Sequence, residues 1–598
     1  MNPLPMKNRP PDRRRPGMVL VVVVVVIALV SLGAYRFVLQ QQAEHESARL
    51  EADRVQAVAV ARSGQAALES VLRLSPAQRE AYGGLYHNSW LAGGLVVDGS
   101  DAMRPGRFFI ISPRLPSDDE ADLPFPSAFA DPGQAAASDD GPLAAADNFA
   151  EGMSPAPATS GSQLAVDAAD LPLARLRNDS RGASFPPASG MSTGQANLTS
   201  PAASGSEPSD VSGTVRAGRT RYRFGCENES AKLNLASLLE WEKTYPGAAR
   251  WALLQLPGMD EATADSILDW IDKDDQPREF GAENDFYQTL TPPYSPTNEL
   301  PATLDSLLAV RGVTAGKLYG NEEDDTSFSG RRIPWCRLLT TASAERSCDF
   351  WGRDKILLNQ GDLSALHGQL RERLDERIAN FVIALRQMGP YEGNDVASAD
   401  GFTADLTRPA AFDIESILDL LSAKVNVGTK DEPHLLGSPF GTAEHWHESF
   451  VWFCDTTTTS EQKILTGRVN LRYAAREVLA AIPAMDAVTL DAILAARQPI
   501  VASALTPNYS DPTWLVTQQI VNLERFRKLQ PYLTMGGDLF QAQIIGSYGP
   551  NSPAHRALLM LDATETDTRQ IYCVDLSRWG LPDSLREMWV SAFATNAD

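Results

Sequence analysis

The strongest hydrophobic pattern of the chain lies near its N-terminus. The 18 residues from Met18 to Tyr35 carry no charge, and the residues before them are rich in Lys and Arg. Eighteen residues make about 27 Å of helix, which suits a bilayer core of roughly 30 Å. The basic leader predicts a cytoplasmic N-terminus and an external remainder. The alternative is an ordinary signal peptide cut near Ser31-Leu32-Gly33.

A helical pattern continues beyond the apolar run. Apolar residues recur near helical spacing from Leu50 to Leu72, in a stretch rich in Ala, Gln, Glu and Arg with no Pro before Pro76. The apolar run and the polar stretch that follows it together predict one helix of about 55 residues, or roughly 80 Å. Ser75-Pro76 predicts a new N-cap and a short second helix that ends at Gly83-Gly84.

Strand patterns occur in three separate parts of the chain. They lie near residues 103–112, where Phe108 to Ile111 are apolar, near 215–235, and near 532–576. Between the first two, residues 113–214 are rich in Ala, Pro, Ser and Asp, with 14 acidic residues, four Arg and no Lys. This composition predicts a disordered acidic insertion.

An internal repeat lies within the remaining helical sequence. Residues 256–268 (LPGMDEATADSIL) match residues 482–494 (IPAMDAVTLDAIL) at seven of thirteen positions, and residues 307–320 form a weaker third copy. Each copy predicts two helices joined by a tight turn, a helix-hairpin-helix unit. Such hairpins can bind DNA phosphate, but the acidic turns here favour a structural or protein-contact role.

Composition narrows the function classes. The chain has 53 Lys plus Arg and 76 Asp plus Glu, a formal net charge of −23 that argues against nucleic acid as a partner. We find no G-x-S-x-G or phosphate-binding loop motif, and so predict no enzyme activity. Five cysteines are too few for a disulfide scaffold; Cys336 and Cys348 are the first pair to consider, with connectivity left open. His445 and His447 lack a clear third metal ligand.

Six carboxylates lie within fourteen residues after the first hairpin. They are Asp272, Asp274, Asp275, Glu279, Glu283 and Asp285. Clustered acidic side chains supply the six to eight oxygens that calcium takes, and the ion relieves their mutual repulsion. Pro277 stands where an EF-hand needs Gly, so the loop is not an EF-hand. The alternative is a solvated acidic loop; Glu227 and Glu229 are possible additional ligands.

The order of these features resembles a known family. A basic leader ending in Gly17, followed by an apolar residue that begins a long protruding helix, is similar to the type IV pilin-like proteins of secretion machines. Their usual Glu at the fifth mature position is Val22 here, which narrows the resemblance to minor pseudopilin K of the type II secretion system. Asp-Trp-Ile-Asp at 269–272, Gly-Ala-Glu at 281–283, Pro-Pro-Tyr at 292–294 and Gly-Val-Thr at 312–314 follow in the family's order. The resemblance covers residues 13–112, 215–320 and 462–598, with departures at Cys226 and Ala236.

The resemblance implies processing, location and partners. A prepilin peptidase would cut between Gly17 and Met18 and methylate Met18. The chain would be a single-pass inner-membrane protein anchored through Met18–Tyr35, with its head in the periplasm. It would cap the pseudopilus tip with other minor pseudopilins and so support protein export across the outer membrane. Calcium is expected on Asp272, Asp274, Asp275, Glu283 and Asp285. The alternative function is a single-pass envelope scaffold whose helical domain is a docking platform.

The implied fold class is α+β: a long N-terminal helix on a small antiparallel sheet, with a large inserted α-helical domain that contains the hairpin units. The expected segments are the leader (1–17), the N-terminal helix (18–74), the start of the head (75–112), the acidic insertion (113–214), head strands (215–235), a first helical domain (236–320), a divergent helical region (321–461), a second hairpin unit (462–500) and C-terminal head strands (501–598).

Overall fold

The structure is a computed structural model of the full chain. It describes residues 16–86, 88, 91–97, 105–113, 222–320, 333–393, 395, 397, 402–429, 432–442, 448–502 and 507–594. Most of the leader, nearly all of the acidic insertion and His445 and His447 lie outside the described residues.

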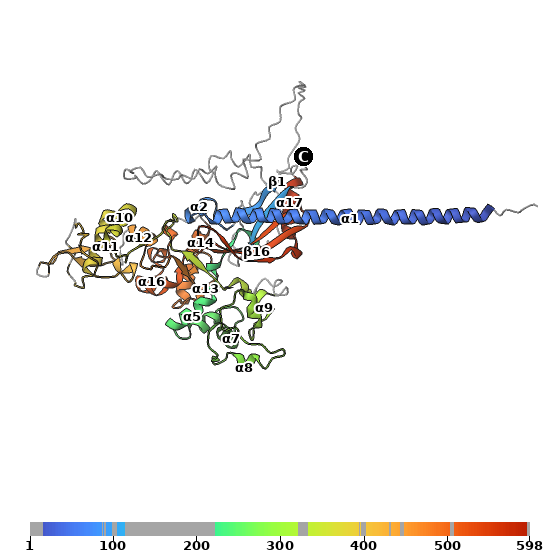
Figure 1. The fold of residues 1–598 in the computed structure, drawn as a ribbon. Coiled ribbons are helices and arrows are strands. Elements are labelled where there is room, and N and C mark those ends of the chain that lie inside the picture. The colour runs from blue at the N-terminus through green and yellow to red at the C-terminus, as the bar shows by residue number, and fades with distance from the viewer. Residues whose placement is uncertain are drawn as a thin grey trace, which may run out of the picture.

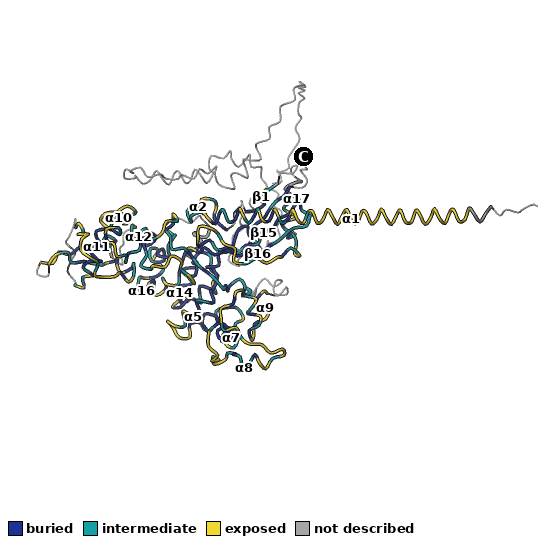
Figure 2. Tube along the Cα trace, viewed as in Figure 1, coloured by how far each residue is buried: buried dark blue, intermediate teal, exposed yellow. Residues whose placement is uncertain are grey.

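A single long helix dominates the shape. Helix α1 (Pro16–Leu72) has 57 residues and projects from the head as a straight rod (Figure 1). From Leu20 its residues are exposed along the N-terminal half, and one face of the helix becomes buried from Ala57 onward (Figure 2). Within the described residues, α1 is the one helix long and apolar enough to cross a membrane. The continuous helix that the sequence predicted is therefore present.

A seven-stranded antiparallel sheet holds the buried end of α1. Its main path runs β1 (Ala92–Val97), β2 (Gly106–Pro113), β15 (Leu539–Ser547), β16 (Ala554–Asp562) and β17 (Arg569–Asp575); β3 (Tyr222–Phe224) pairs with β2, and β4 (Glu227–Asn228) with β15. Strands from three distant parts of the chain thus form one sheet. The fold is α+β, with the long N-terminal helix on an antiparallel sheet, as the sequence predicted.

Two apolar cores lie on opposite faces of this sheet. On one face α1 packs closely: a Cβ on Gly546 would lie 2.4 Å from the backbone nitrogen of Ala61, so only glycine fits there. On the other face, Trp589 of helix α17 (Asp583–Ala594) is fully buried against Phe109 of β2. The strands β2 and β15 are therefore covered on both faces, which suits their nearly continuous burial, whereas the edge strand β17 is exposed.

The helical domain is inserted between β4 and β15. Its helices α10 (Leu363–Arg373) and α11 (Glu376–Met388) lie past the C-terminal end of α1, whereas α7 (Glu261–Ile271) and α8 (Asn284–Tyr287) lie below the sheet in the view of Figure 1. After η5 (Glu229–Ala231) and β5 (Leu233–Asn234), its first part contains α5 (Leu235–Thr244), α6 (Ala248–Leu254), α7 (Glu261–Ile271), α8 (Asn284–Tyr287), η6 (Leu304–Ala309) and α9 (Ala315–Tyr319). The second part contains η8 (Trp335–Arg337), β6 (Leu339–Thr340), β7 (Ala344–Arg346), β8 (Ile356–Leu357), α10 (Leu363–Arg373), α11 (Glu376–Met388), η9 (Ile417–Leu420), β9 (Lys424–Asn426), β10 (Leu435–Gly437), α12 (Ser449–Thr456), β11 (Thr457–Thr458) and β12 (Ile464–Thr466). The last part contains β13 (Val469–Asn470), α13 (Arg476–Ala480), α14 (Ala487–Ala502), η10 (Pro507–Tyr509), α15 (Trp514–Thr517), α16 (Leu523–Leu529), η11 (Gln530–Tyr532) and β14 (Leu533–Thr534).

The three hairpin copies share one turn geometry. The residue two positions before the helix N-cap has a positive φ in each copy: 71° at Gly258, 65° at Ala484 and 83° at Gly312. The side chain two residues later then caps the next helix, as when Asp260 accepts a hydrogen bond from the backbone N–H of Thr263 at 2.8 Å. Asp486 and Thr314 cap their helices in the same way. The repeated sequence therefore encodes a repeated local structure.

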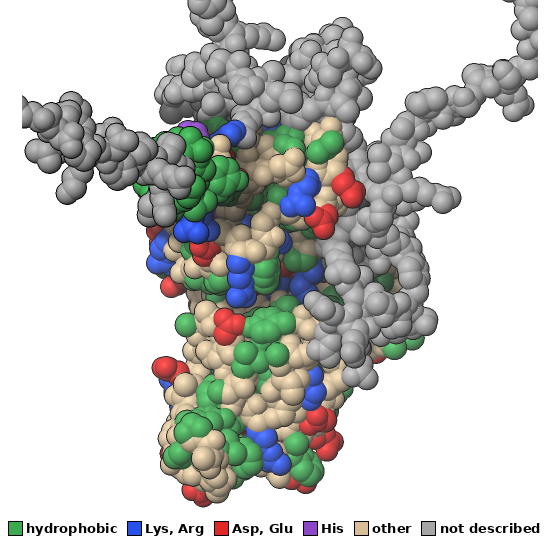
Figure 3. Space-filling view, turned by 90° about the vertical axis from the view of Figure 1, so that its right-hand side faces the viewer, with side chains coloured by type: hydrophobic (Ala, Val, Ile, Leu, Met, Phe, Trp, Pro, Cys, Tyr) green, Lys and Arg blue, Asp and Glu red, His purple; other side chains and the backbone are tan. Residues whose placement is uncertain are grey.

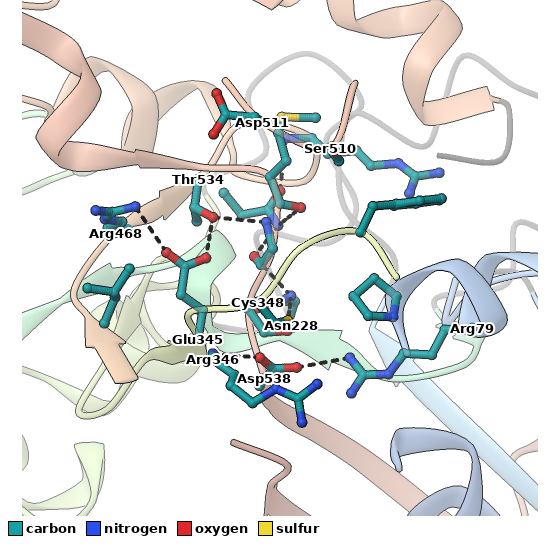
Figure 4. A pocket seen from close by; sticks show the side chains of 18 of the residues that line it. Arg79, Asn228, Glu345, Arg346, Cys348, Arg468, Ser510, Asp511, Thr534 and Asp538 are labelled. Atoms are coloured by element: carbon teal, nitrogen blue, oxygen red, sulfur yellow. Dashed lines mark hydrogen bonds and ion pairs between the residues drawn. The ribbon is translucent and has the colours of Figure 1, made fainter. Parts of the chain in front are cut away.

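Buried polar contacts join the helical domain to the sheet. Arg79 of the short helix α2 (Pro76–Ala81) donates a 3.0 Å hydrogen bond to Asp538, and the second oxygen of Asp538 accepts from the backbone N–H of Arg346 in β7 (Figure 4). Beside them, Glu345 contacts Arg468 and Thr534 around a cavity of about 150 Å³. These links fix the helical domain relative to the end of α1.

Some features differ from the sequence interpretation. The sequence interpretation assigns 501–598 to head strands, but residues 507–532 are largely helical and the chain continues after β17 into α17. The apolar residues of α17 follow a helical period, which accounts for the difference. All five cysteines, which lie within the described residues, are free thiols, so Cys336 and Cys348 form no disulfide here.

Candidate metal site in the helical domain

The acidic loop begins where α7 ends. Asp260 caps the start of α7, and the helix stops at Asp272, whose backbone is extended and whose N–H still bonds to the carbonyl of Leu268. The loop then runs to Glu283, immediately before α8. Helix and loop together place Asp265, Asp269 and Asp272 at the base of the loop.

One arginine–aspartate pair joins α6 to α7, and a second holds this loop to α7. Arg250 binds the fully buried Asp265 through two hydrogen bonds of 2.6 Å. Arg278 reaches from the loop to two carboxylates, with its Nη1 2.7 Å from Asp269 and 2.5 Å from Asp272. Charge-assisted hydrogen bonds of this kind are among the strongest in proteins. The loop is therefore held to α7 rather than extended into solvent.

Gly281 allows the loop to cross a buried carboxylate. A Cβ at this position would lie 1.8 Å from Oδ2 of Asp269, so any side chain here would displace the Asp269 carboxylate. Asp269 is fully buried and accepts hydrogen bonds from the backbone N–H and the side chain of Arg278. The Gly-Ala-Glu stretch thus has a steric reason for its glycine.

Several oxygens in this region lack a hydrogen-bond donor within the described part of the chain. They are Oδ1 of Asp272, both carboxylate oxygens of Glu283 and Oδ1 of Asn298. Glu283 is only 4% exposed. Unpaired buried oxygens cost free energy, and a bound cation is one way to satisfy them.

The electrostatics of Glu283 agree with this geometry. Burial, followed by the nearby charges of Asp269, Asp272, Asp275 and Asp274, raises the pKa of Glu283 to about 7. Burial likewise raises the pKa of Asp272, against the opposing effect of Arg278. The carboxylates therefore lie close enough to repel one another, which is the condition that a divalent cation relieves.

The other predicted ligands occupy different positions. Asp274 and Asp275 are exposed; the amide nitrogen of Asn298 donates to the backbone carbonyl of Asp274 and to the side chain of Asp275 at 2.8 Å. Asp285 is exposed on α8. Asn298 is the residue that sequence reasoning left out of the ligand set, because it lies 13 residues beyond the acidic cluster. Its φ of 49° is one that asparagine tolerates better than most residues.

Glu227 and Glu229 belong to a separate cluster. Both are buried beside Lys232, at 3.2 and 2.7 Å, and Glu227 also lies 3.4 Å from Arg337. Burial raises the pKa of Glu227, but the charges of Lys232, Arg337 and Arg223 together outweigh burial and lower the pKa overall. These two residues are already neutralised by protein cations and do not extend the acidic loop.

The residues of the loop fit a calcium ion chemically. Carboxylate and amide oxygens are the ligands that calcium prefers, and the unpaired oxygens of Asp272, Glu283 and Asn298 are of this type. Across the described residues, however, no three His, Cys, Asp or Glu side chains are already drawn together as a ligand set. Binding would therefore require the loop oxygens to converge.

The visible surface shows no stripe of basic side chains. On the face that looks along α1 from its N-terminal side, Lys and Arg are interspersed with Asp and Glu (Figure 3). A basic stripe would be needed for phosphate binding, and this face does not offer one.

Comparison with known proteins gives a family match over the same domain. Residues 231–319 match the family model described as type II secretion system (T2SS), protein K. The chain is 41% identical over 83 residues to type II secretion system protein K of Aeromonas hydrophila, covering 13% of this chain and 25% of that protein. A second protein of this description, from Escherichia coli (strain K12), is 39% identical over 74 residues, covering 12% and 23%. The chain thus aligns with about a quarter of the length of these curated relatives.

A solved structure is also similar in part. It is the GspK-GspI-GspJ complex from the type 2 secretion system of enterotoxigenic Escherichia coli, with 11% sequence identity and a TM-score of 0.23 over 59% of this chain and 78% of that chain. The family-model match covers α5 to α9, the hairpin and the acidic loop.

Proposed function

We propose that this chain, which belongs through residues 231–319 to the type II secretion system protein K family, is a minor pseudopilin that caps the tip of the pseudopilus. In this role it supports protein export across the outer membrane, as a structural component rather than an enzyme. The observation that carries the proposal is the position of α10 and α11 of the helical domain, which lie past the C-terminal end of α1 (Figure 1).

The geometry suits a terminal subunit. Pilin-like filaments stack subunits along their N-terminal helices, so a subunit above this one would meet the helical domain. The buried contacts of Arg79 with Asp538 hold that domain in place at the end of α1. Val22 has no carboxylate to meet the N-terminal amine of a neighbouring subunit, which fits the same position.

The partners follow from this assignment. We expect the head to bind two other minor pseudopilins, of the GspI and GspJ type, as in the E. coli complex. Purified full-length proteins should co-elute as one ternary complex on size exclusion in detergent. Fluorescent labelling should place the chain at filament ends; an even distribution along filaments would contradict the tip role.

Processing offers an independent test. A prepilin peptidase should cut between Gly17 and Met18, so that mass spectrometry of the membrane-derived protein finds N-methyl-Met18 as the first residue. The mature protein should remain anchored in the inner membrane through Met18–Tyr35. Gly17→Val should block the cut. A mature terminus near Ala34 would instead show an ordinary signal peptide and refute the pseudopilin assignment.

We also propose that calcium is the cofactor of the acidic loop. Asp272, Glu283 and Asn298 supply the buried oxygens, and the exposed Asp274 and Asp275 lie on the same loop. Asp285 is the weakest of the predicted ligands because it is exposed on α8 and is not among the charges that raise the pKa of Glu283.

Calorimetric titration of the full chain tests this proposal. Calcium should bind and raise the melting temperature by mass action, and magnesium should do so less well because it demands a tight octahedral site. Asp272→Asn with Asp274→Asn should abolish both effects. Glu279→Gln is the matched control, since Glu279 lies in the same loop with a side chain that is 68% exposed. Calcium uptake that persists in the double variant would place the site elsewhere.

A further inference from the structure

Arg278 occupies an unusual position in the acidic loop. Its Nη1 atom donates to Asp269 at 2.7 Å and to Asp272 at 2.5 Å, so one guanidinium joins two carboxylates. Its backbone N–H also lies 3.2 Å from both oxygens of Asp269. Arg278 is therefore held to Asp269 by main chain as well as side chain, whereas its contact with Asp272 depends on the side chain alone.

The second arginine pair of the domain provides a comparison. Asp265 accepts two hydrogen bonds from Arg250 and one from the backbone N–H of Phe280, so both its oxygens are used. Asp272 is different: Oδ2 accepts from Arg278, while Oδ1 has no donor in the described part of the chain. Asp272 is thus shared between an arginine and the unpaired oxygens of the proposed ion site.

We propose that Arg278 is a built-in competitor of calcium: its guanidinium neutralises Asp272 in the metal-free protein and thereby sets the calcium affinity of the loop. The inference rests on the calcium site proposed above. Calcium affinity in oxygen-ligand sites depends on how many negative charges face the ion. A positive charge on one of the ligands reduces that number and repels the divalent ion.

This arrangement also explains how the loop can fold without an ion. Asp269 and Asp272 would otherwise face each other without compensation, because Asp269 is fully buried and the Asp272 side chain is only 15% exposed. When calcium arrives, Arg278 can release Asp272 and still keep Asp269 through its main-chain hydrogen bonds. The loop therefore has two charge-balanced states, one with arginine and one with the metal.

The test is the substitution Arg278→Gln in the full-length chain, titrated with calcium chloride in a calorimeter. We expect calcium to bind about tenfold more tightly than to the wild type, because one adjacent positive charge is removed. Without calcium, the variant should melt at a lower temperature than the wild type. Its calcium-induced rise in melting temperature should be larger.

Arg250→Gln is the matched control, because Arg250 pairs with Asp265 and touches none of the unpaired oxygens. It should lower the melting temperature without changing the calcium affinity. Arg278→Lys keeps the charge, but a compact ammonium cannot reproduce the planar guanidinium. It should bind calcium at least as tightly as the wild type, and it remains informative if the Gln variant does not fold.

The outcomes separate the two proposals. Absence of calcium binding by the wild type would refute the calcium site itself. Calcium binding by the wild type, with unchanged or weaker binding by Arg278→Gln, would leave the site standing and overturn the competitor role. Weaker binding by Arg278→Lys would also overturn it, because Arg278 would then be orienting the ligands rather than opposing the ion.

Discussion

Replacing Glu283 by Gln should make the calcium-free protein more stable at alkaline pH. The pKa of Glu283 rises from 4.5 to about 7 because the carboxyl is buried among other acidic groups. A raised pKa means that folding favours the protonated form. The corresponding stability is fully present below pH 4.5 and is lost as the pH rises through 7.

The size of the effect follows from the shift. A change of about 2.5 pKa units at about 1.4 kcal/mol per unit gives roughly 3 kcal/mol. Solvent around the exposed Asp274 and Asp275 screens part of this repulsion, so the value is an upper bound. Gln cannot ionise and has nearly the same shape, so the variant should exceed the wild type by up to roughly 3 kcal/mol at pH 8 and match it near pH 4.5.

Equilibrium denaturation of the full chain in calcium-free buffer, at several values between pH 4.5 and 8, measures this difference. Glu279→Gln, on an exposed position of the same loop, is the control and should show no comparable pH-dependent gain. With calcium present the wild type should be the more stable of the two proteins, since Gln supplies one neutral oxygen where Glu supplies a carboxylate. A calcium-free difference that does not grow with pH would refute the assignment of Glu283 as a buried, uncompensated acid.

Four further substitutions test the fold and the acidic loop. Ala484→Gly should stabilise the chain by about 0.5–1 kcal/mol. Relief of the left-handed backbone at alanine gains about 1–2 kcal/mol, and the greater flexibility of glycine in the unfolded chain offsets part of this gain. At the equivalent position of the first copy, Gly258→Ala should destabilise the chain by a similar amount in denaturant titrations. Gly281→Ala should abolish the calcium-dependent melting shift, because the new Cβ would collide with a buried carboxylate. Arg79→Met should cost about 3–5 kcal/mol in the same titrations, because the buried Asp538 would lose its ion pair and keep only the hydrogen bond from the backbone N–H of Arg346; a loss below about 1 kcal/mol would show that this pair does not hold the two domains together.

Local sequence determined the helices and turns of this protein. The uncharged run after the basic leader and the helical spacing beyond it specify α1, because a helix needs only contacts between near neighbours. The hairpin turns were equally readable: positive φ at Gly258 and Gly312, followed by capping side chains, is fixed within a few residues. The acidic loop was found from composition and spacing alone.

The tertiary structure decided which distant residues meet. The pairing of Glu227–Asn228 with Phe540–Gln541 joins segments about 310 residues apart, and no local pattern specifies such a register. In the same way, spacing identified the carboxylates of the loop but not Asn298, nor the neutralisation of Asp272 by Arg278. Charge compensation depends on distances in space. The sequence therefore determined where negative charge accumulates, and only the fold decided which carboxylate oxygens remain unpaired.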